Sequence, residues 1–201
     1  QEKRCFFPKS GSDYRDPFVP WAEKTKDVAV FRGASTGQGV TPDTSSSTTS
    51  LSPETNIRLR AAKLCTTDPV FKDTLDAGIT SWCTRPRSVP GHVELLYLDA
   101  PSVGVGLSKR LSPTQQAAYK YILHLPGHSA AMRLSMELAM GSVLLIPPCK
   151  YKLFFFDWLV PGTHYLSVAE DLSDVPRVVR WCRDHDEACA RIARNARLFY
   201  D

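Results

Sequence analysis

Residues 119–148 contain the side chains whose types and spacing best suit ligand chemistry. An apolar run is followed there by Pro126 and Gly127, then by His128 and several small residues, and then by Arg133. Small residues at the start of a helix leave main-chain N–H groups exposed, and a guanidinium one turn further on can grip two oxygens at once. The pattern predicts a site for a phosphate or a diphosphate. Two other interpretations stay open, namely glycine that only permits close packing and an arginine in a surface ion pair.

The same residues predict the elements that would position this site. An apolar run at residues 121–125 is typical of a buried parallel strand, and Pro126-Gly127 ends it. A helix is expected to begin at residues 128–131, and a second strand follows before Pro148. Together they form one βαβ unit.

A second turn rich in small residues is expected after a short apolar strand at residues 27–31. It covers residues 32–39 and would bring the backbone close to a ligand. If both strands belong to one parallel sheet, both turns lie at the edge formed by the carboxyl ends of the strands, where ligands bind in such folds.

Helices and strands alternate along the rest of the chain. The fold class predicted from this alternation is α/β, a Rossmann-like parallel sheet with helices on both faces. Two helices are expected to begin at Ser52-Pro53 and Ser112-Pro113, because serine caps a helix and proline suits its first position. The remaining expected elements are strands at 79–82, 93–98 and 164–168 and helices at 152–158, 174–183 and 186–200.

Composition excludes several classes of function. The chain has 201 residues, 43% of them apolar, and a net charge of only +4 with the two signs interspersed, so a nucleic-acid partner is not expected. No apolar run is long enough to span a membrane. The six cysteines are scattered without a CxxC pair, so zinc is not expected and a disulfide pattern is not legible.

The chain is expected to divide into two parts. Residues 1–27 are proline-rich and are predicted to be an irregular linker from a missing or truncated N-terminal half, because the chain begins at Gln1 rather than at methionine. Residues 28–201 are predicted to form one domain, with a low-complexity insertion rich in serine and threonine at about 41–52.

An ordered set of short motifs points to a known family. In chain order the motifs are Phe31-Arg32-Gly33, Ser35-Thr36-Gly37, Thr55-Asn56-x-Arg58, Leu75-Asp76-Ala77-Gly78, Tyr119-Lys120-Tyr121, Gly127-His128-x-Ala130-Ala131-x-Arg133, Gly141-Ser142, His164-Tyr165 and Asp171-Leu172-Ser173. This set resembles glycosyltransferase family 90, the group of protein O-glucosyltransferases, protein O-xylosyltransferases and fungal capsule-associated transferases. The resemblance covers nearly all of the chain from Trp21 onward.

The resemblance implies the C-terminal, donor-binding half of a GT-B glycosyltransferase. Such an enzyme would transfer glucose or xylose from UDP-glucose or UDP-xylose to a hydroxyl group of a protein or glycan acceptor, with inversion and without a metal ion or other cofactor. The secretory lumen, either the endoplasmic reticulum or the Golgi, is the compartment expected for the family. The residues expected to bind the donor are Arg32, Gly33, Ser35, Thr36, Gly37, Gly127, His128, Ser129, Ala130, Ala131, Arg133 and Glu137.

The catalytic base is not identified in this chain. Asp13 and Asp16 are candidates, but aspartate beside arginine and proline is more typical of a turn, and the base is expected to lie outside the chain. The alternative is a catalytically incomplete domain that binds a nucleotide sugar or a protein partner. A dinucleotide-dependent dehydrogenase is not expected, because no GxGxxG motif with a following ribose-binding acid occurs.

Some side chains have two open interpretations. Glu137 lies one turn beyond Arg133 and could accept a hydrogen bond from a ribose hydroxyl or pair with that arginine. His124 is expected to be a core or edge residue. The aromatic residues at 154–158 could form a wall for the acceptor, although packing is favoured, and Trp82 could stack on the uracil or be buried.

Overall fold

The computed structural model describes residues 16–37, 56–83 and 104–201 of the chain. The predicted strand at 93–98 and the low-complexity insertion lie outside the described residues. In chain order the elements, with η marking a 3-10 turn, are η1 (Trp21–Glu23), β1 (Lys26–Ala34), α1 (Ile57–Thr67), α2 (Pro69–Lys72), β2 (Leu75–Ser81), α3 (Pro113–Ala117), β3 (Tyr119–Leu123), α4 (Leu134–Ala139), β4 (Val143–Ile146), η3 (Phe156–Trp158), β5 (Leu166–Ser167), α5 (Val175–Asp184) and α6 (Asp186–Tyr200).

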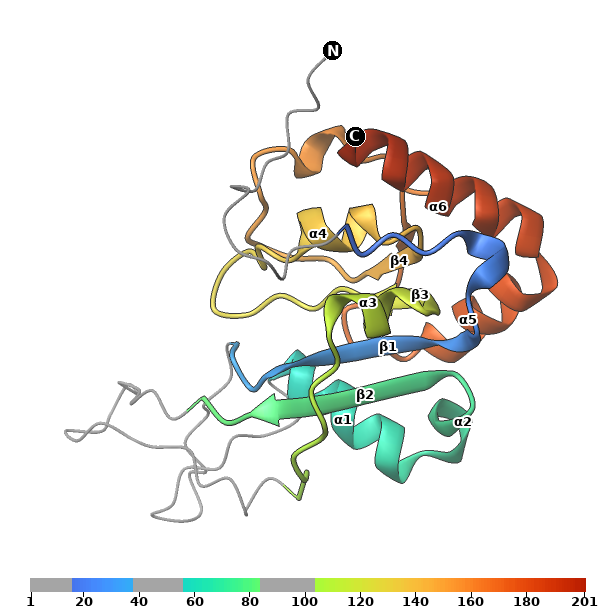
Figure 1. Ribbon diagram of the computed structural model, residues 1–201. Coiled ribbons are helices and arrows are strands. Elements are labelled where there is room, and N and C mark those ends of the chain that lie inside the picture. The colour runs from blue at the N-terminus through green and yellow to red at the C-terminus, as the bar shows by residue number, and fades with distance from the viewer. Residues whose placement is uncertain (1–15, 38–55, 84–103) are drawn as a thin grey trace.

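The described strands form one parallel sheet in the order β2-β1-β3-β4-β5 (Figure 1). The central strands are almost continuously apolar, as expected for strands that are buried on both faces. The predicted α/β class with a parallel sheet is confirmed.

Alternating side chains divide the core into two layers. Phe31, Tyr121 and Leu145 belong to a layer that also contains side chains of α1, α2 and α5. Ile122 and Leu144, one position away on their strands, belong to the layer that contains side chains of α3 and α4. Helix α6 contributes to both layers. Helices therefore cover both faces of the sheet, as the sequence predicts.

Two helix starts show how local capping worked. Helix α3 begins at Pro113 with a complete capping box between Ser112 and Gln115, as predicted. The predicted helix start at Ser52-Pro53 lies outside the described residues, and helix α1 begins at Ile57 with Asn56 as its N-cap. The Asn56 side chain accepts hydrogen bonds from the backbone N–H groups of Arg58 and Leu59, and its own backbone is extended.

Two predictions about the ligand-facing turns are wrong. Strand β1 continues to Ala34, so Arg32 and Gly33 lie within the strand because they pair with Gly78 and Ile79 of β2. Helix α4 begins only at Leu134, so residues 128–131 are not a helix N-terminus. Tertiary contacts made by Arg58 and by His128 hold the loop after β3 in a non-helical path.

The C-terminal third follows the prediction in its long helices and departs from it in its short elements. Helices α5 and α6 form at the predicted places. The expected helix at 152–158 is only the 3-10 turn η3, and the expected strand at 164–168 shortens to β5. No helix among the described residues is long and apolar enough to cross a bilayer. All five cysteines in the described ranges are free thiols.

Candidate functional site

The sheet order creates a crevice between β1 and β3. From β1 the chain runs through α1 to β2 on one side, whereas from β3 it runs through α4 to β4 on the other side. Neighbouring parallel strands whose connections diverge in this way leave a gap at their carboxyl ends, which is the usual ligand position in open α/β sheets. The gap here lies between the loops at residues 35–37 and 124–127, and we call it the switch-point crevice.

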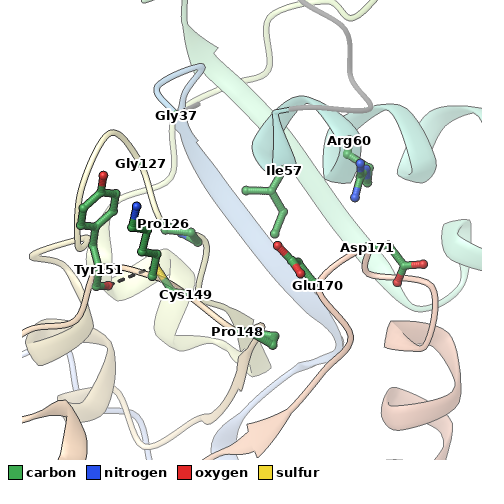
Figure 2. Close-up of a pocket in the computed structure, with 11 residues that line it drawn as sticks. Gly37, Ile57, Arg60, Pro126, Gly127, Pro148, Cys149, Tyr151, Glu170 and Asp171 are labelled. Atoms are coloured by element: carbon green, nitrogen blue, oxygen red, sulfur yellow. Dashed lines mark hydrogen bonds between the residues drawn. The ribbon is translucent and has the colours of Figure 1, made fainter. Parts of the chain in front are cut away.

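A cavity of about 440 Å³ opens beside these loops (Figure 2). Gly37 and Gly127 reach it from the two loops, and its charged lining residues are Arg60, Lys150, Glu170 and Asp171. Figure 2 shows Gly127 on one side and Arg60 and Asp171 on the other, with Glu170 between them pointing towards Ile57. The lining thus carries cations for an anion and carboxylates that could accept hydroxyl hydrogen bonds.

Arg58 ties the two loops of the crevice together. Its guanidinium donates to the carbonyl oxygens of Ala34 (3.1 Å), Leu125 (3.0 Å) and Pro126 (2.8 Å), and to Oγ1 of Thr36 (2.5 Å). Five N–H donors in a rigid fork suit arginine to such a role. One side chain from α1 therefore sets the separation between the end of β1 and the loop after β3.

Arg58 keeps its charge although it is 4% exposed. Burial, and to a smaller extent the nearby charge of Arg133, lower the pKa of its guanidinium to about 10. This value is still well above neutral pH, so the crevice holds a permanent cation at its base.

Two guanidiniums lie close to the ring of Phe31. Arg58 lies 5.6 Å and Arg133 lies 5.5 Å from the ring centroid, both within the range of cation–π attraction. The charge of Glu137 attracts both arginines, and its Oε1 lies 4.0 Å from Nε of Arg133. Two cations beside one carboxylate leave this part of the crevice with an excess of positive charge.

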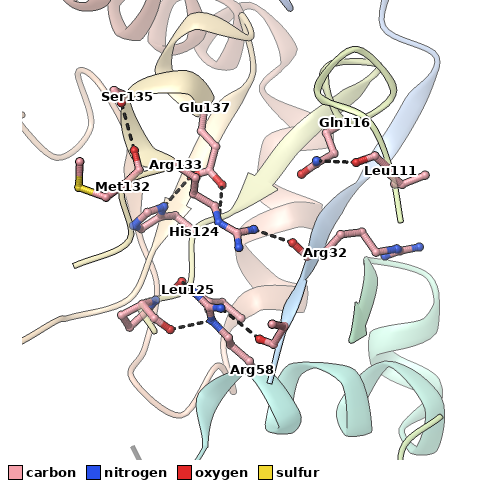
Figure 3. A network of polar contacts seen from close by, with 12 residues as sticks. Arg32, Arg58, Leu111, Gln116, His124, Leu125, Met132, Arg133, Ser135 and Glu137 are labelled. Carbon is pink, nitrogen blue, oxygen red and sulfur yellow. Dashed lines mark hydrogen bonds and ion pairs between the residues drawn. The ribbon is translucent and has the colours of Figure 1, made fainter. Parts of the chain in front are cut away.

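Arg133 contacts the main chain of Arg32 and the carboxylate of Glu137 (Figure 3). Its Nη1 donates to the carbonyl oxygen of Arg32 at 2.5 Å, and its Nε lies 4.0 Å from Oε1 of Glu137. The other carboxylate oxygen, Oε2, lies 2.6 Å from Nδ1 of His124. Glu137 is 1% exposed and His124 6% exposed, so this pair forms the buried end of the network.

The glycines at 33 and 127 leave room for these arginines. A Cβ atom on Gly33 would lie 2.9 Å from Nη2 of Arg133 and equally close to the Phe31 ring. A Cβ atom on Gly127 would lie 2.9 Å from Oγ1 of Thr36 and 3.1 Å from Nη2 of Arg58. Gly33 and Gly127 therefore allow side chains to approach the backbone closely. Among the glycines predicted to bind the donor, only Gly37 has a positive φ, of 143°.

Arg32 does not reach the crevice as a cation. Its guanidinium forms a 2.6 Å ion pair with Asp76 of β2 and also donates to the backbone carbonyl of Asp76. Tyr119 donates to the same carboxylate at 2.6 Å. Figure 3 shows the Arg32 side chain pointing away from Arg133, while its carbonyl oxygen faces that residue. Within the crevice the main chain of Arg32, rather than its charge, makes the contact.

The hydroxyl residues after β1 serve the loop itself. Ser35 is 2% exposed, and its Oγ accepts from the N–H of Cys83 at 2.8 Å. Thr36 accepts from Arg58. Both residues shape the first loop, and neither lines the cavity.

His128 joins the two predicted turns. Its Nδ1 accepts from the N–H of Gly37 at 3.3 Å, and its Nε2 lies 3.4 Å from Sγ of Cys83. Because Nδ1 is the acceptor, Nε2 carries the ring hydrogen in the neutral tautomer. Ser129, Ala130 and Ala131 follow in the loop before α4, and their amides lack the alignment of a helix N-terminus.

The aromatic candidates divide between surface and core. Phe154 is 71% exposed and Trp158 is 64% exposed, whereas Phe155 and Phe156 pack against the second core layer. The favoured interpretation, packing, therefore holds for two of these residues. Trp82 is partly buried against the first core layer.

The sequence patterns do not reveal the cavity's own charges or the bridging role of Arg58. Arg58 stands in a motif that was recognised, yet its spacing alone gives no sign that it crosses to β3. Arg60 is two residues further along α1, and Lys150 and Glu170 follow the ends of β4 and β5. Position after a strand end in a parallel sheet was the available signal for the latter two.

Comparison with known proteins gives a family match. The model of Glycosyl transferase family 90 matches residues 82–201. Uncharacterized protein 179R of Invertebrate iridescent virus 6 is 39% identical over 98% of this chain, and protein O-glucosyltransferase 3 of Homo sapiens is 26% identical over 70% of it. The chain spans 17% of the length of the viral protein and 25% of the human protein.

The crystal structure of Anabaena Alr3699/HepE in complex with UDP-glucose covers 86% of this chain, with 12% sequence identity and a TM-score of 0.45, and the match spans 44% of that protein.

Proposed function

Because the chain belongs to glycosyltransferase family 90, we propose that it is the donor-binding portion of a glycosyltransferase that uses a UDP-sugar. The switch-point crevice holds the diphosphate of the donor in this proposal. The sugar transferred is glucose or xylose, and the acceptor is a hydroxyl group of a protein or glycan.

One observation carries the proposal. Arg58 and Arg133 both lie within about 6 Å of the Phe31 ring centroid, and Glu137 is the carboxylate that interacts with both. Such a concentration of positive charge beside a cavity favours an anionic ligand, and a diphosphate supplies oxygens for a guanidinium to grip. Arg60 and Lys150 in the cavity lining would add to the same attraction.

The same groups would assist the reaction as well as binding. When the bond between the sugar and UDP breaks, negative charge grows on the departing diphosphate. A fixed guanidinium stabilises that charge without having to reorganise, which lowers the barrier. We propose inversion at the anomeric carbon, with the base supplied from outside this chain and no metal ion required.

Titration calorimetry with UDP tests donor binding directly. Replacing Arg133 by alanine removes one charge-assisted contact, for which we expect a loss of about 1.5–3 kcal/mol, or roughly ten- to a hundredfold in affinity. Arg180→Ala is the matched control, because Arg180 is an exposed arginine on α5. Failure of the folded native chain to bind UDP would refute the proposal.

A turnover assay separates the two functional interpretations. If the base lies elsewhere, the chain alone binds UDP and transfers no sugar to an acceptor. Turnover by the 201 residues alone would show that this assignment of the base is wrong.

A further inference from the structure

The carboxylate of Glu137 is buried and must be compensated within the fold. Its side chain is 2% exposed, and its two oxygens are divided between two partners. Oε2 lies 2.6 Å from Nδ1 of His124, a short hydrogen bond, and Oε1 lies 4.0 Å from Nε of Arg133. An ionised carboxylate can only accept, so Nδ1 of His124 donates in that state.

His124 is fixed independently of this contact. Its backbone N–H donates to the carbonyl oxygen of Leu145, which lies on the adjacent strand β4, at 2.9 Å. The main chain from which the imidazole projects is therefore anchored to the sheet. The hydrogen bond of the imidazole fixes the orientation of the Glu137 carboxylate, and with it the direction in which Oε1 faces.

Arg133 depends on that orientation. Its Nη1 is occupied by the carbonyl oxygen of Arg32, its plane lies near the Phe31 ring, and Gly33 leaves space beside Nη2. Among the described residues, Nη2 has no hydrogen-bond partner, so it remains available for a ligand oxygen. The Nε edge of the guanidinium faces Oε1 of Glu137 at 4.0 Å (Figure 3), so a turn of the carboxylate changes the charge beside that edge.

We infer that His124 is a positioning residue for the donor diphosphate, acting through Glu137 on Arg133. This inference rests on the proposed function of the crevice and deepens it. Glu137 then pairs with Arg133 and does not bind ribose. Pairing with Arg133 is the second of the two interpretations left open by its sequence position. The role of His124 is to keep the guanidinium ready before the donor arrives, since each degree of freedom fixed in advance reduces the cost of binding.

The experiment is a double-mutant cycle measured by titration calorimetry with UDP and, separately, with uridine. We expect His124→Ala to weaken UDP binding about tenfold, the size of one misplaced charge-assisted hydrogen bond. His124→Asn places an amide N–H near the position of Nδ1 and restores most of the affinity. Uridine carries no phosphate, so its affinity changes little in either variant.

The cycle with Arg133→Ala distinguishes positioning from general damage. In that background His124→Ala has no further effect on UDP affinity, because the group it positions is absent. Additive losses of UDP affinity from the two substitutions would overturn the inference, and so would a loss of uridine affinity as large as the loss of UDP affinity. A His124→Ala variant that binds UDP like the native chain would overturn it as well. The last result leaves the proposed function standing, whereas absence of UDP binding in the native chain removes both.

Discussion

Replacing Arg58 by methionine tests whether one side chain holds the crevice together. Methionine has a similar length and no charge, so the change removes four hydrogen bonds to Ala34, Leu125, Pro126 and Thr36 while keeping much of the volume. We expect a folded chain that is clearly less stable and that binds UDP weakly.

The magnitude follows from two opposing contributions. Hydrogen bonds to a charged group contribute about 1.5–3 kcal/mol each, so losing all four removes about 6 kcal/mol or more. The burial that lowers the pKa of Arg58 from 12.5 to about 10 costs about 3 kcal/mol, and methionine recovers that cost. The net loss is therefore at least about 3 kcal/mol, which is a large share of the 5–15 kcal/mol typical of a domain.

Urea unfolding measures this loss, with two comparison variants. Arg58→Lys keeps the charge but has a single nitrogen, which cannot reach four acceptors arranged around a fork, and we expect an intermediate stability. Lys63→Met, an exposed position on the same helix, should change stability by less than about 0.5 kcal/mol. A loss below about 1 kcal/mol for Arg58→Met would refute the reasoning.

Two further predictions concern Lys24 and Gly33. The amino group of Lys24 is buried against the carbonyl oxygens of Ala117 and Met140 and Oγ of Ser142, and burial lowers its pKa to about 7. Between about pH 7 and 10.5 the unfolded chain therefore still holds a proton on Lys24 that the native chain has lost. Stability should therefore rise with pH across that window, and less so in Lys24→Met; urea unfolding at pH 6.5 and 9.5 measures the difference, and equal slopes would contradict it. Gly33→Ala should weaken UDP binding by about fivefold or more, because the new methyl group displaces the Arg133 guanidinium. Gly106→Ala is the control, since its Cβ would meet open space; an equal effect of both substitutions on UDP affinity, measured by calorimetry, would contradict the steric argument.

Apolar pattern and capping predicted the framework well because both signals are local. The strands β1, β3 and β4 and the helices α5 and α6 follow runs whose periodicity is clear over several residues. Ser112 and Pro113 fixed the start of α3 through contacts within four residues.

The loops at the crevice could not be predicted in the same way, because distant residues shape them. The run Ser129-Ala130-Ala131 has good helix propensity, yet Arg58 holds the carbonyls of Leu125 and Pro126 from another element, and the helix starts later. Propensity is a weak signal when tertiary contacts compete with it.

The predicted donor-binding residues were brought to one edge of the sheet, but their roles could not be read from residue type. Arg32 is a cation one residue after Phe31, but its side chain forms an ion pair with Asp76 on the neighbouring strand. Which side of a strand a residue faces depends on register, and the sequence motif does not reveal where the partner carboxylate lies. Their part in donor binding remains a prediction.

The fourfold attachment of Arg58 has a mechanical consequence. Its guanidinium bridges the end of β1 and the loop after β3. These two walls of the crevice cannot separate without breaking several hydrogen bonds at once. Motions that admit or release a ligand must then come from the surrounding segments, such as the stretch between Gly127 and α4. The backbone amides of the two walls should therefore exchange with solvent only through global unfolding of the sheet. The amides between Gly127 and α4 should exchange through local fluctuations.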